Sequence, residues 1–143
     1  MLKPDRLTAA EFELMKKHAE YGKRIIYSTA QKIEGNNFLI IAGEIAYGHH
    51  EKWDGTGYPL GLAGQDIPLS SRIMTVADVY DALISRRCYK PPFPHEDSIR
   101  MMREKRGKIF DPVIFDAFLG MEEKIREIAA RFPEEGELVL GDR

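Results

Sequence analysis

Four polar residues interrupt segments that are otherwise apolar, and their chemical types suit metal binding. His18 lies on the apolar half of a long amphipathic segment, and His49 and His50 end a second apolar segment. Asp78 interrupts a third. Burying such groups costs several kcal/mol unless a partner compensates, so chemistry is best sought at these positions. Because imidazole and carboxylate ligands without sulfur suit Fe, Mn or Zn better than Ca, the four residues predict a transition-metal site.

Each residue also has a purely structural explanation. A single histidine on an apolar helix face, such as His18, is more often a packed core residue than a ligand. His49 and His50 are adjacent, so about 100° separates them on a helical wheel and they do not easily bind one ion together. Asp78 could pair with a nearby arginine instead of a metal ion. The two candidate arginines are Arg72 and Arg86. The metal prediction therefore depends on the coincidence of these residues on otherwise apolar helices.

Five helical segments are expected to position these groups, at about residues 8–33, 36–50, 70–85, 96–106 and 113–131. Thr8 and Glu11 form a capping box at the start of the first. The second carries apolar residues at helical spacing and is expected to be mostly buried. Asp111 and Pro112 supply an N-cap and a first-turn proline before the last. No segment alternates with a β period, so the sequence predicts an all-α bundle, with His95 solvated at a helix start.

The composition limits the classes of function. The 143 residues suit one domain, and the 43% of hydrophobic residues can form its core. A net charge of −2 excludes an electrostatic scaffold for nucleic-acid polymers, so any phosphate recognition must be local. The chain has a single cysteine and lacks both a signal-peptide pattern and an apolar run of about 18 residues. These features predict a cytoplasmic protein that does not bind membranes.

A long ordered stretch, HHEKWDGTGYPLGLAGQDIPLSSRIMTVADVYDALISRRCYK, spans residues 49–90. It resembles the core of the HD-GYP family, the bacterial phosphodiesterases of the HD superfamily that cleave cyclic di-GMP. The segments LKPDRLTAAEFELMKKH and GKIFDPVIFDAFL resemble the family on either side of it. The resemblance implies an HD-type helical bundle and a bacterial signalling protein, such as a response regulator, with this domain as its output.

The resemblance also implies roles for individual residues. It makes His18, His49, His50 and Asp78 the ligands of a centre of two or three Fe or Mn ions. Arg87 and Lys90 match the basic pair that holds a substrate phosphate, although Cys88 stands where the family commonly has proline.

Two further positions are expected to contact the substrate. Gly57, Tyr58 and Pro59 are the signature triplet of the family, in a loop near the mouth of the site, and Tyr58 is the substrate-binding member. Asp81 matches a second acidic position close to the metal ions. Diguanylate cyclases are expected partners at the triplet loop.

One feature departs from the family, because no His-Asp dipeptide occurs in the chain. In the family that pair lies upstream of the segment that resembles residues 2–18. We therefore expect a truncated HD-GYP domain over residues 1–132 and a polar tail over 133–143. Without a bridging aspartate, the isolated chain is expected to hold metal partially or not at all and to be inactive. The Phe12 and Phe38 faces should be exposed, which predicts self-association.

Three functions from different classes stay open. The first is a portion of a metal-dependent phosphodiesterase domain that hydrolyses cyclic di-GMP. The second is another HD-superfamily nucleotide phosphohydrolase. The third is a non-catalytic interaction module that docks partners through the loop at residues 53–67. A metal assay separates the two enzymes from the module, and a substrate panel separates one enzyme from the other.

Overall fold

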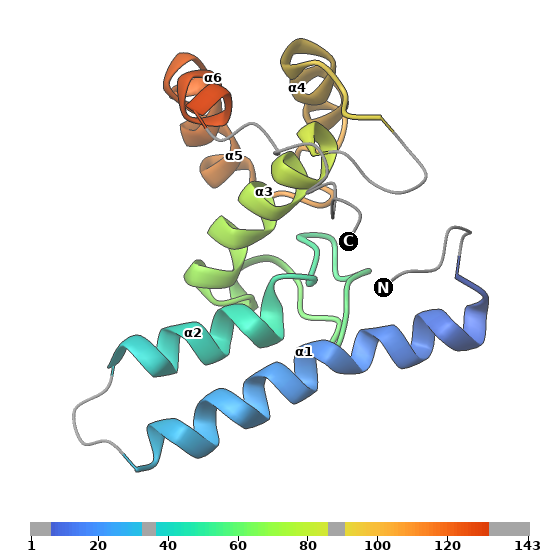
Figure 1. The fold of residues 1–143 in the computed structure, drawn as a ribbon, viewed down its shortest axis with the longest axis vertical. Coiled ribbons are helices and arrows are strands. Elements are labelled where there is room, and N and C mark those ends of the chain that lie inside the picture. The colour runs from blue at the N-terminus through green and yellow to red at the C-terminus, as the bar shows by residue number, and fades with distance from the viewer. Residues whose placement is uncertain (1–6, 33–36, 86–90, 132–143) are drawn as a thin grey trace, which may run out of the picture.

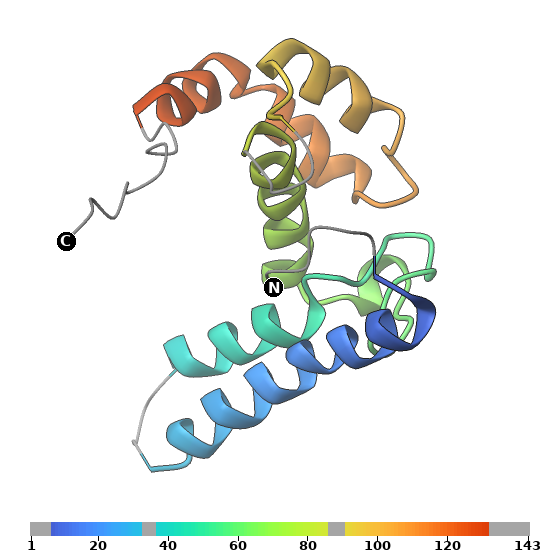
Figure 2. The same cartoon turned by 45° about the vertical axis from the view of Figure 1, so that its right-hand side comes forward.

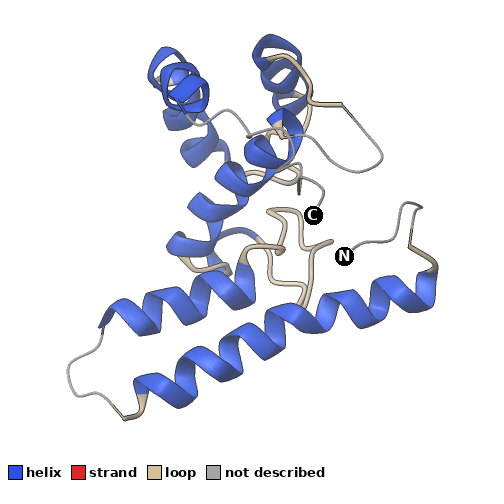
Figure 3. Cartoon of the chain, in the orientation of Figure 1, coloured by secondary structure: helices blue, strands red, loops and turns tan. Residues whose placement is uncertain are grey.

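The computed structural model describes residues 7–32, 37–85 and 91–131, and most of these residues are helical, with a long loop between the second and third helices (Figures 1 and 3). Within these ranges there is no sheet, and the β contacts are the isolated bridges between Asp54 and Ala63 and between Arg106 and Phe110. The all-α prediction is therefore confirmed. The helices are α1 (Ala9–Ala30), α2 (Asn37–Gly48), α3 (Leu69–Ile84), α4 (His95–Arg103), α5 (Pro112–Leu119) and α6 (Glu122–Arg131), with a 3-10 turn at Gly64–Asp66.

Helices α1 and α2 lie side by side and form one part of the molecule (Figures 1 and 2). The predicted capping box starts α1, because Thr8 accepts from the Glu11 N–H and the Glu11 carboxylate accepts from the Thr8 N–H. Glycines let the two helices approach closely. A Cβ on Gly43 would lie 3.1 Å from the Tyr27 ring, and one on Gly22 would lie 3.4 Å from Ala46.

The prediction that the second helix is mostly buried is wrong. Only Gly43 and Gly48 are buried in α2, whereas Phe38 is 75% exposed and Ile41 is 47% exposed. Glycines make the closest contacts of α2 with its neighbours, whereas the large side chains of Phe38, Ile40 and Ile41 are exposed. Phe12 on α1 is also 40% exposed, and the expected exposure of the Phe12 and Phe38 faces is observed.

The apolar core lies in the other part of the molecule, where α3 packs against α4 and α5 (Figure 2). Its buried members are Val76, Tyr80, Ile99, Met102, Phe110 and Phe115. Asp111 joins two elements of this core. It caps α5 by accepting from the Val113 N–H at 2.8 Å, as predicted, and it accepts from Arg72 Nη1 on α3 at 2.7 Å. Helix α3 thus connects the core to the layer of α1 and α2.

Two local predictions in this part are wrong. The segment expected as one helix over 113–131 is divided into α5 and α6, because α5 ends at Leu119 and is followed by Gly120, a residue with low helix propensity. His95 is not solvated: its side chain is 13% exposed, and its Nδ1 lies 2.8 Å from the Tyr80 hydroxyl. The ring packs against Tyr80 because α4 starts directly beside α3.

None of the helices in the described ranges combines the length and the apolar character needed to cross a membrane.

Candidate metal centre

Three of the predicted ligands meet where α1 passes the end of α2. His18, His49 and His50 each offer a ring nitrogen, and these nitrogens all lie within 4.8 Å of one another. The Nε2 atoms of His18 and His50 are 3.1 Å apart. Two nitrogens bound to one ion at about 2.1 Å and at right angles lie about 3.0 Å apart, so this spacing fits a shared ion.

The helical-wheel argument against joint binding by His49 and His50 does not hold, because α2 ends at Gly48. The two histidines follow the helix, so the separation of about 100° between helical neighbours does not apply to them. Their ring centroids are 3.9 Å apart. Adjacent positions in the sequence therefore contribute to one cluster.

Hydroxyl groups of α3 hold the end of α2 in place. The buried Ser71 hydroxyl donates to the Glu44 carbonyl at 2.8 Å, and the buried Thr75 hydroxyl donates to the His49 carbonyl at 2.9 Å. Gly48 makes the close approach possible, since a Cβ there would lie 2.5 Å from Ser71 Oγ. These contacts join α3 to the last turn of α2 and to the His49 backbone, and so fix the position of His49.

The hydrogen bonds of two imidazoles leave their Nε2 atoms ready to bind a cation. His18 Nδ1 lies 2.6 Å from the Met15 carbonyl, and His49 Nδ1 lies 2.8 Å from the Ile45 carbonyl. A carbonyl oxygen can only accept, so Nδ1 carries a hydrogen and Nε2 is the ring nitrogen left for a cation. Metal-binding histidines are commonly oriented in this way. The donor set therefore fits a divalent ion.

The third imidazole is held in its neutral form. Burial, and then the nearby His49 and His18 rings, lower the pKa of His50 to about 4. Burial disfavours the charged imidazolium, and neighbouring positive charge acts in the same direction. An imidazole must be in its neutral form to bind a cation, because the imidazolium has no free lone pair, so His50 meets this condition at neutral pH.

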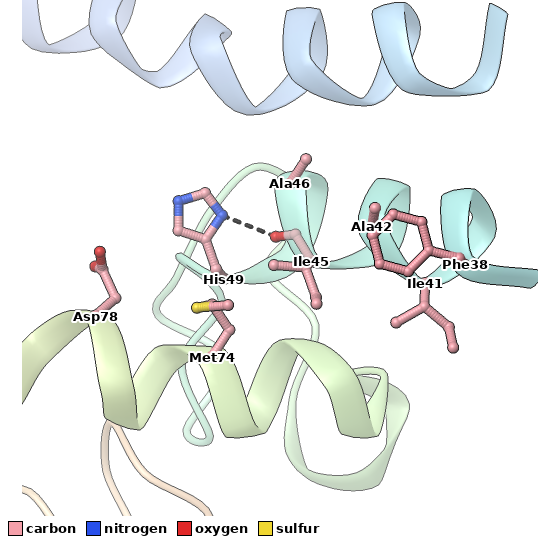
Figure 4. Close-up of a pocket in the computed structure, with 8 residues that line it drawn as sticks. All are labelled: Phe38, Ile41, Ala42, Ile45, Ala46, His49, Met74 and Asp78. Atoms are coloured by element: carbon pink, nitrogen blue, oxygen red, sulfur yellow. Dashed lines mark hydrogen bonds between the residues drawn. The ribbon is translucent and has the colours of Figure 1, made fainter. Parts of the chain in front are cut away.

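Asp78 lies next to this cluster but outside the group of three histidines. It is exposed on α3 and, together with His49 and Met74, lines a pocket of about 400 Å³. Figure 4 shows the Asp78 carboxylate and the His49 ring rising from their elements toward the same side, which faces α1. The suggested pairing of Asp78 with Arg72 is not observed, because Arg72 bonds to Asp111. The other suggested partner, Arg86, lies outside the described residues.

Apolar side chains of α2 form most of the remaining wall of this pocket. They are Phe38, Ile41, Ala42, Ile45 and Ala46.

The signature loop, which carries the triplet Gly57, Tyr58 and Pro59, folds back over the histidines. The Tyr58 ring stacks on His50 at a centroid distance of 4.7 Å, and Phe12 of α1 meets Tyr58 edge-on at 6.1 Å. Burial, with a smaller effect of the Asp78 charge, raises the pKa of Tyr58 to about 12, so its hydroxyl stays protonated. Gly57 and Pro59 flank this ring in the same loop.

The remaining predicted substrate residues lie elsewhere or cannot be placed. Asp81 is exposed on α3 and lines a different pocket, of about 620 Å³, together with Tyr80, His95 and Arg126. The structure therefore does not bring Asp81 into the histidine cluster. Arg87 and Lys90, with Cys88 between them, lie outside the described residues.

Sequence reasoning gave no role to three residues that support the site. Ser71 and Thr75 are buried hydroxyls on α3, and Glu51 is a buried carboxylate directly after the histidine pair. An acidic residue at the start of a glycine-rich loop was a signal for Glu51. Small hydroxyl residues inside an apolar helix gave a weaker signal for the other two.

Comparisons with known proteins show which family the chain resembles. The HD domain family matches residues 1–114. A probable cyclic di-GMP phosphodiesterase of Vibrio cholerae is 51% identical over 137 residues, which cover 94% of this chain and 31% of that protein. A cyclic di-GMP phosphodiesterase of Thermotoga maritima is 43% identical over 135 residues, covering 94% of this chain and 35% of that protein.

A third relative has a different substrate in its name. The 3'3'-cGAMP-specific phosphodiesterase 2 of Vibrio cholerae is 39% identical over 132 residues, covering 92% of this chain and 24% of that protein. The chain thus spans about a third or less of the length of these curated relatives. The match over residues 1–114 and the histidine cluster support one conclusion: the chain belongs to the HD domain family.

Proposed function

We propose that this chain contributes metal ligands to a phosphodiesterase centre that hydrolyses cyclic di-GMP, within the output domain of a bacterial signalling protein. The observation that carries the proposal is the meeting of His18, His49 and His50 with ring nitrogens within 4.8 Å. Relatives that are 51% and 43% identical bear the name cyclic di-GMP phosphodiesterase, one of them as probable. The name of the 39% relative makes 3'3'-cGAMP the first alternative substrate to test.

From the resemblance to the HD-GYP family, the ions would be Fe or Mn, two or three in number, and a ligand set of imidazole and carboxylate without sulfur suits these metals. His18, His49 and His50 would hold an ion between α1 and the end of α2, and Asp78 would add a carboxylate from α3. When bound, such ions neutralise phosphoryl oxygens and lower the pKa of a bound water.

Other side chains would bind and orient the diester. Arg87 presents a planar fork of donors to a phosphate oxygen, and Lys90 adds a compact charge. In a chain of net charge −2, such local cations are what attracts an anionic substrate. The protonated Tyr58 hydroxyl can donate a hydrogen bond to the substrate. Asp81, further along α3, would be a second acidic side chain that contacts the substrate.

The signature loop would also offer a contact surface for diguanylate cyclases. Pro59 is exposed, and Leu60 is 57% exposed. The more general reading of the loop as a non-catalytic docking module has less support. The Trp53 N–H donates to the Ile109 carbonyl at 3.1 Å, and the Asp54 N–H donates to the Lys108 carbonyl at 2.9 Å. Trp53 is half-buried and anchors the loop to the bundle.

Metal content and hydrolysis, measured on the same preparation, test the proposal. The chain is loaded with Mn²⁺ or, without oxygen, with Fe²⁺, and is then given cyclic di-GMP or 3'3'-cGAMP. The sequence contains no His-Asp pair, so we expect weak metal binding and no turnover by this chain. The Thermotoga maritima relative serves as the positive control.

The variants separate the two parts of the proposal. His50→Ala should abolish metal binding, and Arg87→Ala should weaken binding of cyclic di-GMP while leaving the metal content unchanged. Absence of metal from the unmodified chain would contradict the proposed centre. Robust metal-dependent turnover would show that the four ligands are sufficient and would contradict the expected inactivity.

A further inference from the structure

A buried carboxylate lies directly after the histidine pair and takes no part in the proposed chemistry. Glu51 is 1% exposed, and charged side chains are rarely buried to that degree without partners. Its Oε1 accepts from the Leu60 N–H at 2.7 Å, and its Oε2 accepts from the Leu62 N–H at 3.0 Å. Both oxygens are therefore bonded to the backbone of the loop, and Glu51 ties that loop to the residue that follows His50.

Tight backbone packing brings the middle of the loop against the same histidine. The Tyr58 N–H donates to the His50 carbonyl at 3.2 Å. A Cβ on Gly57 would lie 2.6 Å from that carbonyl oxygen and 2.5 Å from Glu51 Cα, so only glycine fits there. Gly61, between the two donors to Glu51, has a φ of +68°, which favours glycine. Gly57 and Gly61 thus allow the loop to lie close over His50 and Glu51.

This loop conformation sets the environment of the His50 ring. Tyr58 stacks on that ring with an interplanar angle of 29°. Two residues of α1 also contact the Tyr58 ring: Phe12 meets it edge-on, and Lys16 Nζ lies 5.6 Å from its centroid. The stacked ring restricts the rotation of His50, whose Nε2 faces His18 Nε2.

We propose that Glu51 is a positioning residue for the metal centre. Its carboxylate holds the loop at residues 57–62 in the conformation that stacks Tyr58 on His50, and the stack fixes the direction of His50 Nε2. The inference rests on the proposed function only in that His50 binds a metal ion. Residues that orient metal ligands typically affect metal affinity by about 10–100-fold when they are removed.

Glu51→Gln is the sharpest test, because it keeps the shape and removes one of the two acceptors. The new amide can accept from one of the Leu60 and Leu62 N–H groups, but its NH₂ faces the other. We expect faster hydrogen exchange at one or both of these amides and loss of the nuclear Overhauser contacts between the Tyr58 and His50 rings. Mn²⁺ affinity, measured by calorimetry on the full chain, should fall by about 10-fold or more.

Asp66→Asn is the matched control for charge. Asp66 is an exposed carboxylate of the same loop, in the turn at Gly64–Asp66. This variant removes the same charge without touching Glu51, so its Mn²⁺ affinity and its ring contacts should equal those of the unmodified chain.

A second pair of variants keeps the inference testable if Glu51→Gln does not fold. Tyr58→Phe retains the stacked ring and should keep the Mn²⁺ affinity, whereas Tyr58→Leu removes the ring and should lower it by about 10-fold. The inference is overturned if Glu51→Gln, or in its place Tyr58→Leu, binds Mn²⁺ as the unmodified chain does. Persistence of the Tyr58 to His50 contacts in Glu51→Gln would also overturn it.

Failure of the proposed function looks different. In that case the unmodified chain binds no Mn²⁺, and the ring contacts and amide exchange, which need no metal, decide whether Glu51 positions His50.

Discussion

Replacing Asp111 with alanine should be among the most damaging changes to the fold. Asp111 is 4% exposed, accepts from Arg72 Nη1 at 2.7 Å and caps α5 through the Val113 N–H at 2.8 Å. Removing one partner of a buried ion pair costs about 3–5 kcal/mol, because the other charge stays buried. Losing an N-cap costs about 1 kcal/mol more.

The structure indicates that the cost of losing the Asp111 ion pair lies near the upper end of the range of about 3–5 kcal/mol. The Arg72 side chain is 17% exposed, so its guanidinium can only partly recover contact with water. Its Nε is buried and has no hydrogen-bond partner among the described residues. We therefore expect Asp111→Ala to lower the free energy of unfolding by about 4–5 kcal/mol, much of the about 5–15 kcal/mol typical of a domain.

Urea denaturation followed by far-ultraviolet circular dichroism measures this loss, and two variants separate its causes. Asp111→Asn keeps the cap but removes the charge, so it should fall between the unmodified chain and Asp111→Ala. Asp116→Asn is the matched control, since Asp116 lies on the helix that Asp111 caps and bonds to an arginine, Arg106, at 2.6 Å. That pair is exposed to solvent, so its loss should change little. A loss below about 1 kcal/mol for Asp111→Ala would refute the reasoning.

Three further outcomes follow from the same structure. Gly48→Ala should lower the free energy of unfolding by about 1–3 kcal/mol in urea titrations, because the new Cβ would lie 2.5 Å from Ser71 Oγ. Adding Ser71→Gly to this variant should restore part of the loss, because it removes the hydroxyl that the Cβ meets. In EDTA, the unfolding free energy should fall as the pH drops from about 6.5 to 4, since the unfolded state protonates His50 first. The slope stays below about 1.4 kcal/mol per pH unit for a half-buried ring, and His50→Gln should flatten it. Sedimentation velocity should reveal self-association that Phe38→Asp reduces, because Phe38 is 75% exposed; a monomer at all concentrations would contradict this.

Much of the fold could be predicted because its signals are local. The capping box at Thr8 and the Asp111 cap depend on residues within three positions of each other, and both are confirmed. The break at Gly120 was missed because the apolar spacing continues across it. The burial of α2 was mispredicted for a different reason: spacing identifies an apolar face but does not say whether another element covers it.

The site, too, could be predicted only in part. The convergence of His18 with the pair at 49–50 was expected from residue types and from the family resemblance. The supporting contacts were not, because they join side chains to backbone groups far along the chain. The Glu51 carboxylate reaches amides at positions 60 and 62, and the Thr75 hydroxyl reaches the His49 carbonyl. Neither hydrophobic periodicity nor a short sequence motif predicts such contacts.

Paramagnetic broadening of the histidine rings by Mn²⁺ tests the metal centre most directly. The chain has four histidines, and His95, bonded to Tyr80 in the other part of the molecule, provides an internal control. In a titration of ¹⁵N-histidine protein, we expect the ring signals of His18, His49 and His50 to broaden at the lowest Mn²⁺ concentrations while those of His95 stay sharp. Equal broadening of all four rings, or none at these three, would contradict a metal site at the end of α2.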